Sequence, residues 1–112
     1  MDRKKSITQI NKNYIKVAKA LATKAGENGY KVKSLYIFGS RVSEKSTKWS
    51  DLDMCLVSPN VSENLFDERV KFSIIGHEVS DSLEVHPMSP YDFNDKYNLL
   101  AREVKKTGVR II

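Results

Sequence analysis

Two short apolar runs flank a polar stretch of the chain, and this pattern constrains the fold more than any other feature. The runs are Leu35–Phe38 and Met54–Val57, and the residues between them are mostly polar. Short runs of aromatic and branched residues, bounded by glycine or polar residues, are typical of buried β-strands. The sequence therefore predicts a strand over 33–38 and a second strand over 51–57, joined by a polar connection.

The polar connection opens with the pair Gly39-Ser40, directly after the first predicted strand. Glycine has no side chain, so the backbone can bend sharply there and come close to a ligand. A short helix over 41–44 is expected next, and its free N–H groups would suit an anion such as phosphate. Arg41 could pair with a phosphate oxygen or with a surface carboxylate, and the sequence leaves both interpretations open.

Two aspartates, Asp51 and Asp53, stand at the start of the second predicted strand. On an extended strand the spacing i, i+2 places both carboxylates on the same face. Adjacent carboxylates repel each other unless a cation lies between them, and hard oxygen ligands favour Mg²⁺. The connection thus joins a phosphate-binding bend to a candidate magnesium site.

A third carboxylate lies on a later predicted strand, where Leu83 and Val85 alternate with Glu84 and His86. If the apolar residues face the helices, Glu84 shares the open face with the two aspartates. His86 would face the same way, as a substrate contact or as a structural histidine. We favour the structural interpretation, because a lone histidine on a strand is more often structural than catalytic.

The pattern of the whole chain predicts an α/β fold, in which a small mixed sheet has its helices packed on one face and the acids on the other. Helical spacing of apolar residues and the capping residue Ser6 support the first helix. The remaining expected elements are a helix over 7–25, a helix over 64–80, a strand over 82–88, a helix that begins after Ser89 and ends before Gly108, and a short edge strand over 109–112.

The spacing of these motifs is similar to that of a known family. Gly39-Ser40, ten residues, and then Asp51-x-Asp53 resembles the signature of nucleotidyltransferases with the DNA polymerase β-like fold. The flanking residues, Phe38-Gly-Ser-Arg41 and Ser50-Asp-Leu-Asp53, resemble the minimal nucleotidyltransferase branch, which consists of small stand-alone domains. The resemblance extends over nearly the whole chain.

The resemblance implies transfer of a nucleoside monophosphate, with AMP favoured, from an NTP such as ATP to a hydroxyl acceptor. It implies that Asp51, Asp53 and Glu84 are catalytic and bind two Mg²⁺ ions. Many minimal members carry Asp where this chain has Glu84. The resemblance also implies that Gly39, Ser40 and Arg41 bind the triphosphate.

Minimal members of this family often work with a protein partner. Members paired with HEPN-type toxins act as antitoxins that add AMP to a tyrosine of the toxin. The resemblance therefore implies a protein partner, either a HEPN-type toxin or a substrate-binding subunit. Self-association into a homo-oligomer is left open.

Length and composition bound the remaining possibilities. Because the chain has 112 residues, we expect a single domain over 1–112. The chain has no apolar run long enough to span a bilayer and only one cysteine, so a cytoplasmic location is expected and no membrane partner.

The net charge of +5 is unevenly distributed, since residues 1–33 hold nine Lys/Arg against two acids. This basic segment could attract a nucleic acid, but we favour a solvated helix face because no base-reading motif accompanies it. Two alternatives to an enzyme follow. One is a non-catalytic antitoxin or scaffold that binds a partner, and the other is a basic nucleic-acid-binding domain.

Overall fold

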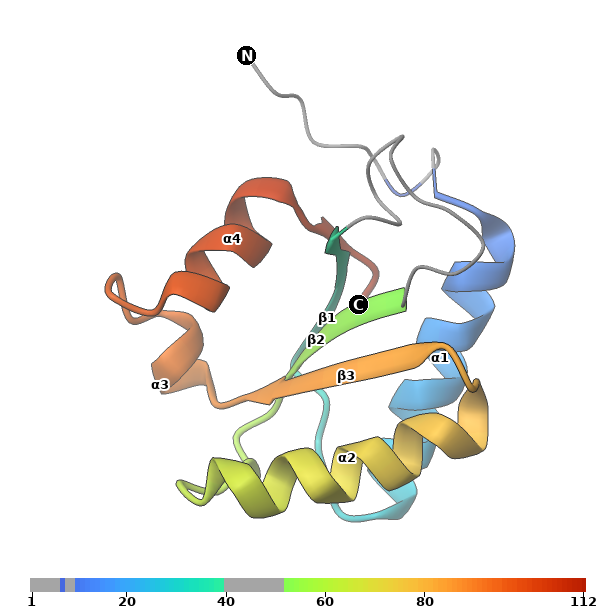
Figure 1. Ribbon diagram of the computed structural model, residues 1–112, viewed down its shortest axis with the longest axis horizontal. Coiled ribbons are helices and arrows are strands. Elements are labelled where there is room, and N and C mark those ends of the chain that lie inside the picture. Colours follow the sequence, from blue (N-terminus) through green and yellow to red (C-terminus); the bar gives the residue numbers. More distant parts are fainter. Residues whose placement is uncertain (1–6, 8–9, 40–51) are drawn as a thin grey trace.

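A four-stranded mixed sheet forms the centre of the molecule (Figure 1). The computed structural model of the protein describes residues 7, 10–39 and 52–112. The strand order is β3-β2-β1-β4. The central pair of strands is antiparallel, β4 is antiparallel to β1, and β3 runs parallel to β2. The strands are β1 (Ser34–Phe38), β2 (Leu52–Val57), β3 (Leu83–Met88) and β4 (Val109–Arg110). The mixed sheet and the short edge strand at residues 109–110 confirm the sequence prediction.

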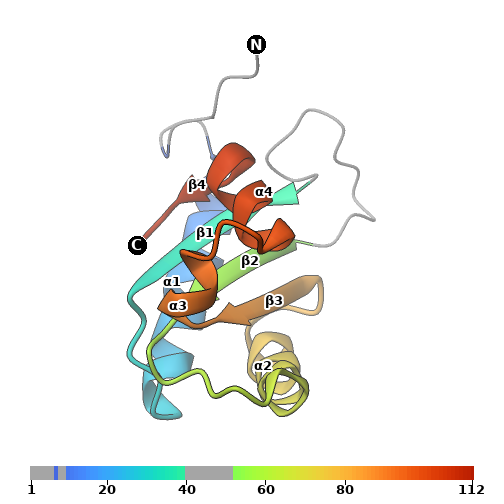
Figure 2. The same cartoon turned by 90° about the vertical axis from the view of Figure 1, so that its left-hand side faces the viewer.

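Four helices in the described residues surround this sheet, and they are α1 (Lys12–Glu27), α2 (Leu65–Val79), α3 (Pro90–Phe93) and α4 (Leu99–Thr107). The two long helices, α1 and α2, cover one side, and the two short helices lie on the other side (Figure 2). None of the helices in the described part of the chain is both long and apolar enough to cross a membrane.

The central strand β2 is buried on both faces, and its alternating side chains divide the core in two. Leu52, Met54 and Leu56 belong to the larger core cluster, beneath α1 and α2. Cys55 and Val57 point the opposite way, into a second cluster. That second cluster is completed by side chains of β1, β3, α3 and α4, namely Phe38, Met88, Phe93, Ala101 and Val104. The expectation that helices pack on one face therefore holds for α1 and α2 and is wrong for α3 and α4.

The first helix begins later and ends later than its apolar pattern indicated. The expected span was 7–25, but α1 begins at Lys12, because Asn11 is its N-cap and accepts a hydrogen bond from the N–H of Asn13 at 2.8 Å. An asparagine oxygen satisfies one of the free N–H groups at a helix start, which stabilises that start. The expected cap Ser6 and the expected helix over 41–44 lie outside the described residues.

The helix expected after Ser89 is two helices. Ser89 caps α3 as predicted, and its hydroxyl accepts a hydrogen bond from the N–H of Asp92 at 3.1 Å. The chain then turns at residues 94–98, and Asn98 caps α4 by accepting from the N–H of Ala101 at 3.0 Å. The turn lets Phe93 and Ala101 both reach the second core cluster.

Close packing of α2 fixes the position of β3, the strand at one edge of the sheet. A methyl group added to Gly76 of α2 would lie 3.1 Å from Cγ2 of Val85 on β3. The missing side chain thus lets the helix approach the strand closely. Since Leu83 and Val85 point toward this helix, the alternate residues Glu84 and His86 of β3 turn to the opposite face.

Candidate active site

Two of the predicted acids lie side by side on neighbouring strands. In the parallel pairing of β2 with β3, Asp53 stands opposite Glu84. Both side chains lie on the sheet face that α1 and α2 do not cover, as the alternation of each strand predicted. Strands in a sheet are separated by about 4.8 Å, so paired residues of this kind bring their carboxylates within reach of one ion.

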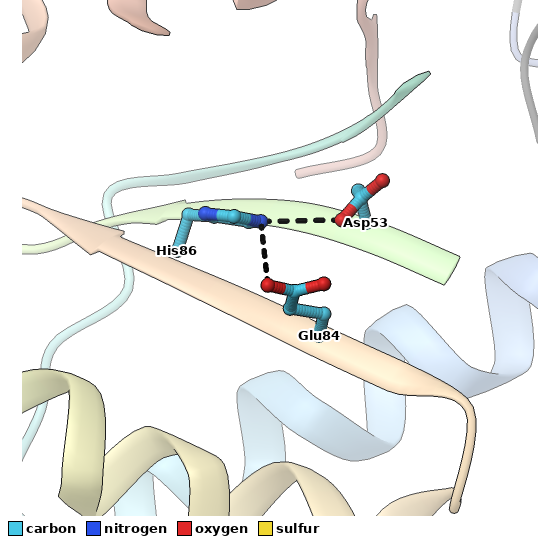
Figure 3. A group of neighbouring side chains, drawn as sticks. All are labelled: Asp53, Glu84 and His86. Carbon is cyan, nitrogen blue, oxygen red and sulfur yellow. Dashed lines mark hydrogen bonds and ion pairs between the residues drawn. The ribbon is translucent and has the colours of Figure 1, made fainter. Parts of the chain in front are cut away.

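His86 joins these two carboxylates (Figure 3). Its Nε2 lies 3.2 Å from Oδ1 of Asp53 and 3.9 Å from Oε1 of Glu84. The imidazole ring also meets the ring of Phe38 edge-on, with the ring centroids 5.2 Å apart. These contacts hold the imidazole against Asp53, so it has a defined position in the site.

Gly39 lies against the other oxygen of Asp53. Its φ of +83° is in the left-handed region, which favours glycine. A methyl group built on Gly39 would lie 2.7 Å from Oδ2 of Asp53. Both the conformation and the contact therefore require glycine at the bend, and the carboxylate of Asp53 is fixed between this bend and His86.

The three side chains form a group that could hold a cation. One ligand atom from each of Asp53, Glu84 and His86 lies within 4.8 Å of the others. Asp53 and His86 are about one-quarter exposed, and Glu84 is the most open of the three at 55%. Two carboxylates supply the hard oxygen ligands that suit Mg²⁺, while imidazole suits transition metals such as Zn²⁺ better. The donor set thus fits a divalent metal ion.

The structure describes only part of the predicted site. Asp51, Ser40 and Arg41 lie outside the described residues, whereas Gly39, Asp53 and Glu84 lie within them. The structure also places His86 against Asp53, a contact that the sequence pattern did not predict. The position of His86 two residues after Glu84 was the available signal, but its contact with Asp53 depends on the pairing of β2 with β3, which the sequence does not show.

Cys55, two residues beyond Asp53, takes no part in this site. Its side chain is fully buried, as predicted for a core residue, and burial raises the pKa of its thiol to about 12. A thiol with that pKa stays protonated at neutral pH, and metal ligation and nucleophilic attack both need the thiolate. Among the described residues, the carboxylates and the imidazole therefore remain as the groups of this face that could bind a metal ion.

A cavity of about 510 Å³ adjoins the acidic group. Glu84 and His86 line it from β3, and Arg69, Ser73 and His77 line it from α2. Cavities of this size commonly accommodate ligands. The acidic group therefore opens onto a space large enough for part of a substrate.

The paired carboxylates on adjacent strands, next to a glycine bend after a buried strand, fit the arrangement that the resemblance to nucleotidyltransferases implied. The family model for the nucleotidyltransferase domain matches residues 15–109, and the chain belongs to that family. The family expected from the sequence is thus confirmed. No curated protein matches the chain.

Solved structures support the same fold. A toxin–antitoxin complex described as MntA-HepT matches with a TM-score of 0.57 and 17% identity, over 86% of this chain and 69% of that one. A toxin–antitoxin structure with AMP-PNP matches with a TM-score of 0.62 and 19% identity, over 92% of this chain and 73% of that one. At this identity the likeness establishes the polymerase β-like fold.

Proposed function

We propose that this protein is a magnesium-dependent nucleotidyltransferase, which transfers a nucleoside monophosphate from an NTP to a hydroxyl group. AMP is the favoured nucleoside monophosphate. The observation that supports it most is the pairing of Asp53 with Glu84 next to the bend at Gly39. Membership of the nucleotidyltransferase domain family supports the same reaction class.

In the proposed reaction the acceptor oxygen attacks the α-phosphorus of the NTP. The bond from that phosphorus to the oxygen bridging the α- and β-phosphates breaks, and pyrophosphate leaves with the electron pair. The proton of the hydroxyl passes to the carboxylate of Glu84, whose exposure leaves it accessible to an acceptor. Catalysis of this kind depends on positioning and charge stabilisation more than on covalent chemistry.

The metal and the triphosphate would be held by residues of the connecting segment and the two strands. Asp51, Asp53 and Glu84 would bind two Mg²⁺ ions, which supply charge neutralisation for the triphosphate and activation of the acceptor hydroxyl. Gly39, Ser40 and Arg41 would bind the phosphates. Within this arrangement His86 keeps Asp53 oriented through the 3.2 Å contact between Nε2 and Oδ1.

The accepting hydroxyl would belong to a protein partner in the cytoplasm. The two similar structures described above are of toxin–antitoxin systems, and one of them contains AMP-PNP. We therefore propose a HEPN-type toxin as the partner and a tyrosine of that toxin as the acceptor. In this role the protein is an antitoxin that inactivates the toxin by AMP transfer.

The proposal is tested by incubating the protein with labelled ATP, Mg²⁺ and the product of the neighbouring gene. Label should appear on that product, and it should fall by at least about a hundredfold with Asp53→Asn, since removal of one charge-stabilising group costs that much in other enzymes. Glu103→Gln, an exposed acid on α4, should leave the labelling unchanged.

Two other outcomes would contradict the proposed enzymatic activity. Partner binding without any transfer, unaffected by Asp53→Ala, would indicate a non-catalytic scaffold. Salt-sensitive RNA binding that survives the loss of the carboxylate would indicate a nucleic-acid-binding domain.

A further inference from the structure

Among the described residues, no strand pairs with the outer edge of β3, which lies beside the candidate site. In the described part of the chain β3 is the last strand of the sheet and pairs only with β2. The backbone groups of its even-numbered residues point toward β2. The carbonyl of Ser82 accepts from the N–H of Leu52, and the carbonyl of Met88 accepts from the N–H of Ser58. In a parallel ladder alternate residues turn their backbone groups the other way, so the N–H and C=O of Val85 point outward.

Pro87 stands at the next outward position of β3. Proline has no N–H, and within sheets it is confined to edge strands and to positions where no ladder bond is lost. Its presence agrees with the outward direction deduced for Val85. The open stretch of the edge is therefore short and lies directly beside Glu84 and His86.

The cavity described above runs along this edge, between β3 and α2, which lie side by side in both views (Figures 1 and 2). Arg69, Ser73 and His77 form its far wall and repeat every four residues, so they follow one line along α2. All three are exposed. The cavity is thus a groove with unpaired main-chain groups on one wall and side-chain donors on the other.

The charges of the groove disfavour a polyanion. Of the fixed charges that line it, Arg69 is positive, while Asp81 and Glu84 are negative. A neighbouring line on α2, formed by Phe66, Val70 and Ile74, is 75%, 45% and 59% exposed. Exposed apolar patches of this kind mark protein-binding surfaces. The charges that line the groove and the exposed apolar residues beside it together favour a polypeptide over a nucleic acid as the ligand.

We propose that the edge of β3 binds an extended polypeptide segment as an additional strand, and that this segment carries the accepting hydroxyl. The inference rests on the nucleotidyltransferase function proposed above and locates the acceptor of that reaction. Main-chain bonds to Val85 would supply affinity, as in other complexes formed by strand addition.

Strand addition also explains how the acceptor reaches the reacting atoms. An added strand would lie about 4.8 Å from β3, and alternate side chains would share the face that holds Glu84 and His86. A tyrosine, serine or threonine at such a position places its O–H beside Glu84, which takes the proton when the oxygen attacks the α-phosphorus. The acceptor class is therefore a side-chain hydroxyl in an extended segment.

Binding can be tested without ATP or metal, so that its outcome is separate from that of the proposed reaction. The probe is a phage-displayed library of short peptides with a fixed central tyrosine, selected on the immobilised whole chain. Peptides enriched on the wild type should bind at least about tenfold more weakly to Ser73→Trp, which fills the groove, and equally well to Lys16→Trp on α1. Hydrogen exchange at the amide of Val85 should slow when a selected peptide is bound.

Several outcomes would overturn the inference. These are the absence of peptide enrichment on the wild type, equal binding to Ser73→Trp, unchanged exchange at Val85, and displacement of the peptide by a single-stranded RNA oligonucleotide. AMP transfer to a protein that Ser73→Trp leaves unaffected would also overturn it while supporting the proposed reaction. Peptide binding as described, without AMP transfer, would support the binding site and contradict the enzyme.

Discussion

Replacing Gly39 by alanine should destabilise the protein by more than its backbone conformation alone requires. Gly39 has a φ of +83°, and an L-residue in that region costs roughly 1–2 kcal/mol. The added methyl group would also lie 2.7 Å from Oδ2 of Asp53. The carboxylate must then rotate away from its position, which costs about 1 kcal/mol in rotamer energy and about 1 kcal/mol in the lost contact with His86.

Gly29 provides a matched control for this substitution. Its φ is +89°, and a methyl group added there meets nothing within 4 Å. Gly29→Ala should therefore show only the backbone cost, less about 0.4–1 kcal/mol gained from the smaller entropy of the unfolded chain. We expect Gly39→Ala to exceed Gly29→Ala by about 1–2 kcal/mol in the free energy of unfolding, measured by urea denaturation.

A double variant isolates the contact with the carboxylate. Asp53→Ala removes the oxygen that the methyl group would strike, so the excess cost of Gly39→Ala should largely disappear in that background. Equal costs for the two glycine substitutions would refute the reasoning, and so would an excess that persists when the carboxylate is absent.

Three further predictions concern groups away from the bend. Tyr30→Phe should lower the free energy of unfolding by about 1–3 kcal/mol, because the Tyr30 hydroxyl donates a 2.7 Å hydrogen bond to the buried carboxylate of Glu68; chemical denaturation would measure this, and an unchanged midpoint would contradict it. The thiol of Cys55, whose pKa burial raises from 9.0 to about 12, should resist alkylation in the native protein at pH 8 and react once the protein is unfolded; rapid native labelling would show that it is not buried. Because the pKa of this thiol is higher in the folded state, its contribution to stability is complete below about pH 9 and is lost as pH rises toward 12. Cys55→Ala removes the titrating group, so the variant should lose less stability than the wild type over this pH range. Urea denaturation at a series of alkaline pH values would measure the difference.

The sequence identified the elements of the fold because their apolar periodicity is strong, but helix boundaries depended on capping choices. Asn11 competes with Ser6 as the start of α1, and periodicity does not distinguish them. The split between α3 and α4 is signalled by the turn-favouring residues Asn94, Asp95 and Asn98, yet both flanking segments share one helical pattern. Only the requirement that Phe93 and Ala101 pack into the same cluster resolves it.

The candidate site was predictable where it depended on alternation within one strand, and not where it depended on pairing between strands. The orientation of Glu84 followed from Leu83 and Val85, which flank it. The contact of His86 with Asp53 requires the register that sets Asp53 opposite Glu84. A shift of two residues would keep Leu83 and Val85 on the buried face but would place a different residue of β3 opposite Asp53, and the sequence alone does not exclude it.

Pro87 has a consequence for behaviour at high concentration. An exposed strand edge can recruit the same edge of another molecule, and this pairing can propagate into aggregates. With a proline at the outward position next to Val85, two copies cannot extend a continuous ladder along β3. Pro87→Val should therefore increase aggregation during prolonged incubation, which light scattering would detect, and the natural proline keeps this edge available to a short segment while limiting growth into fibres.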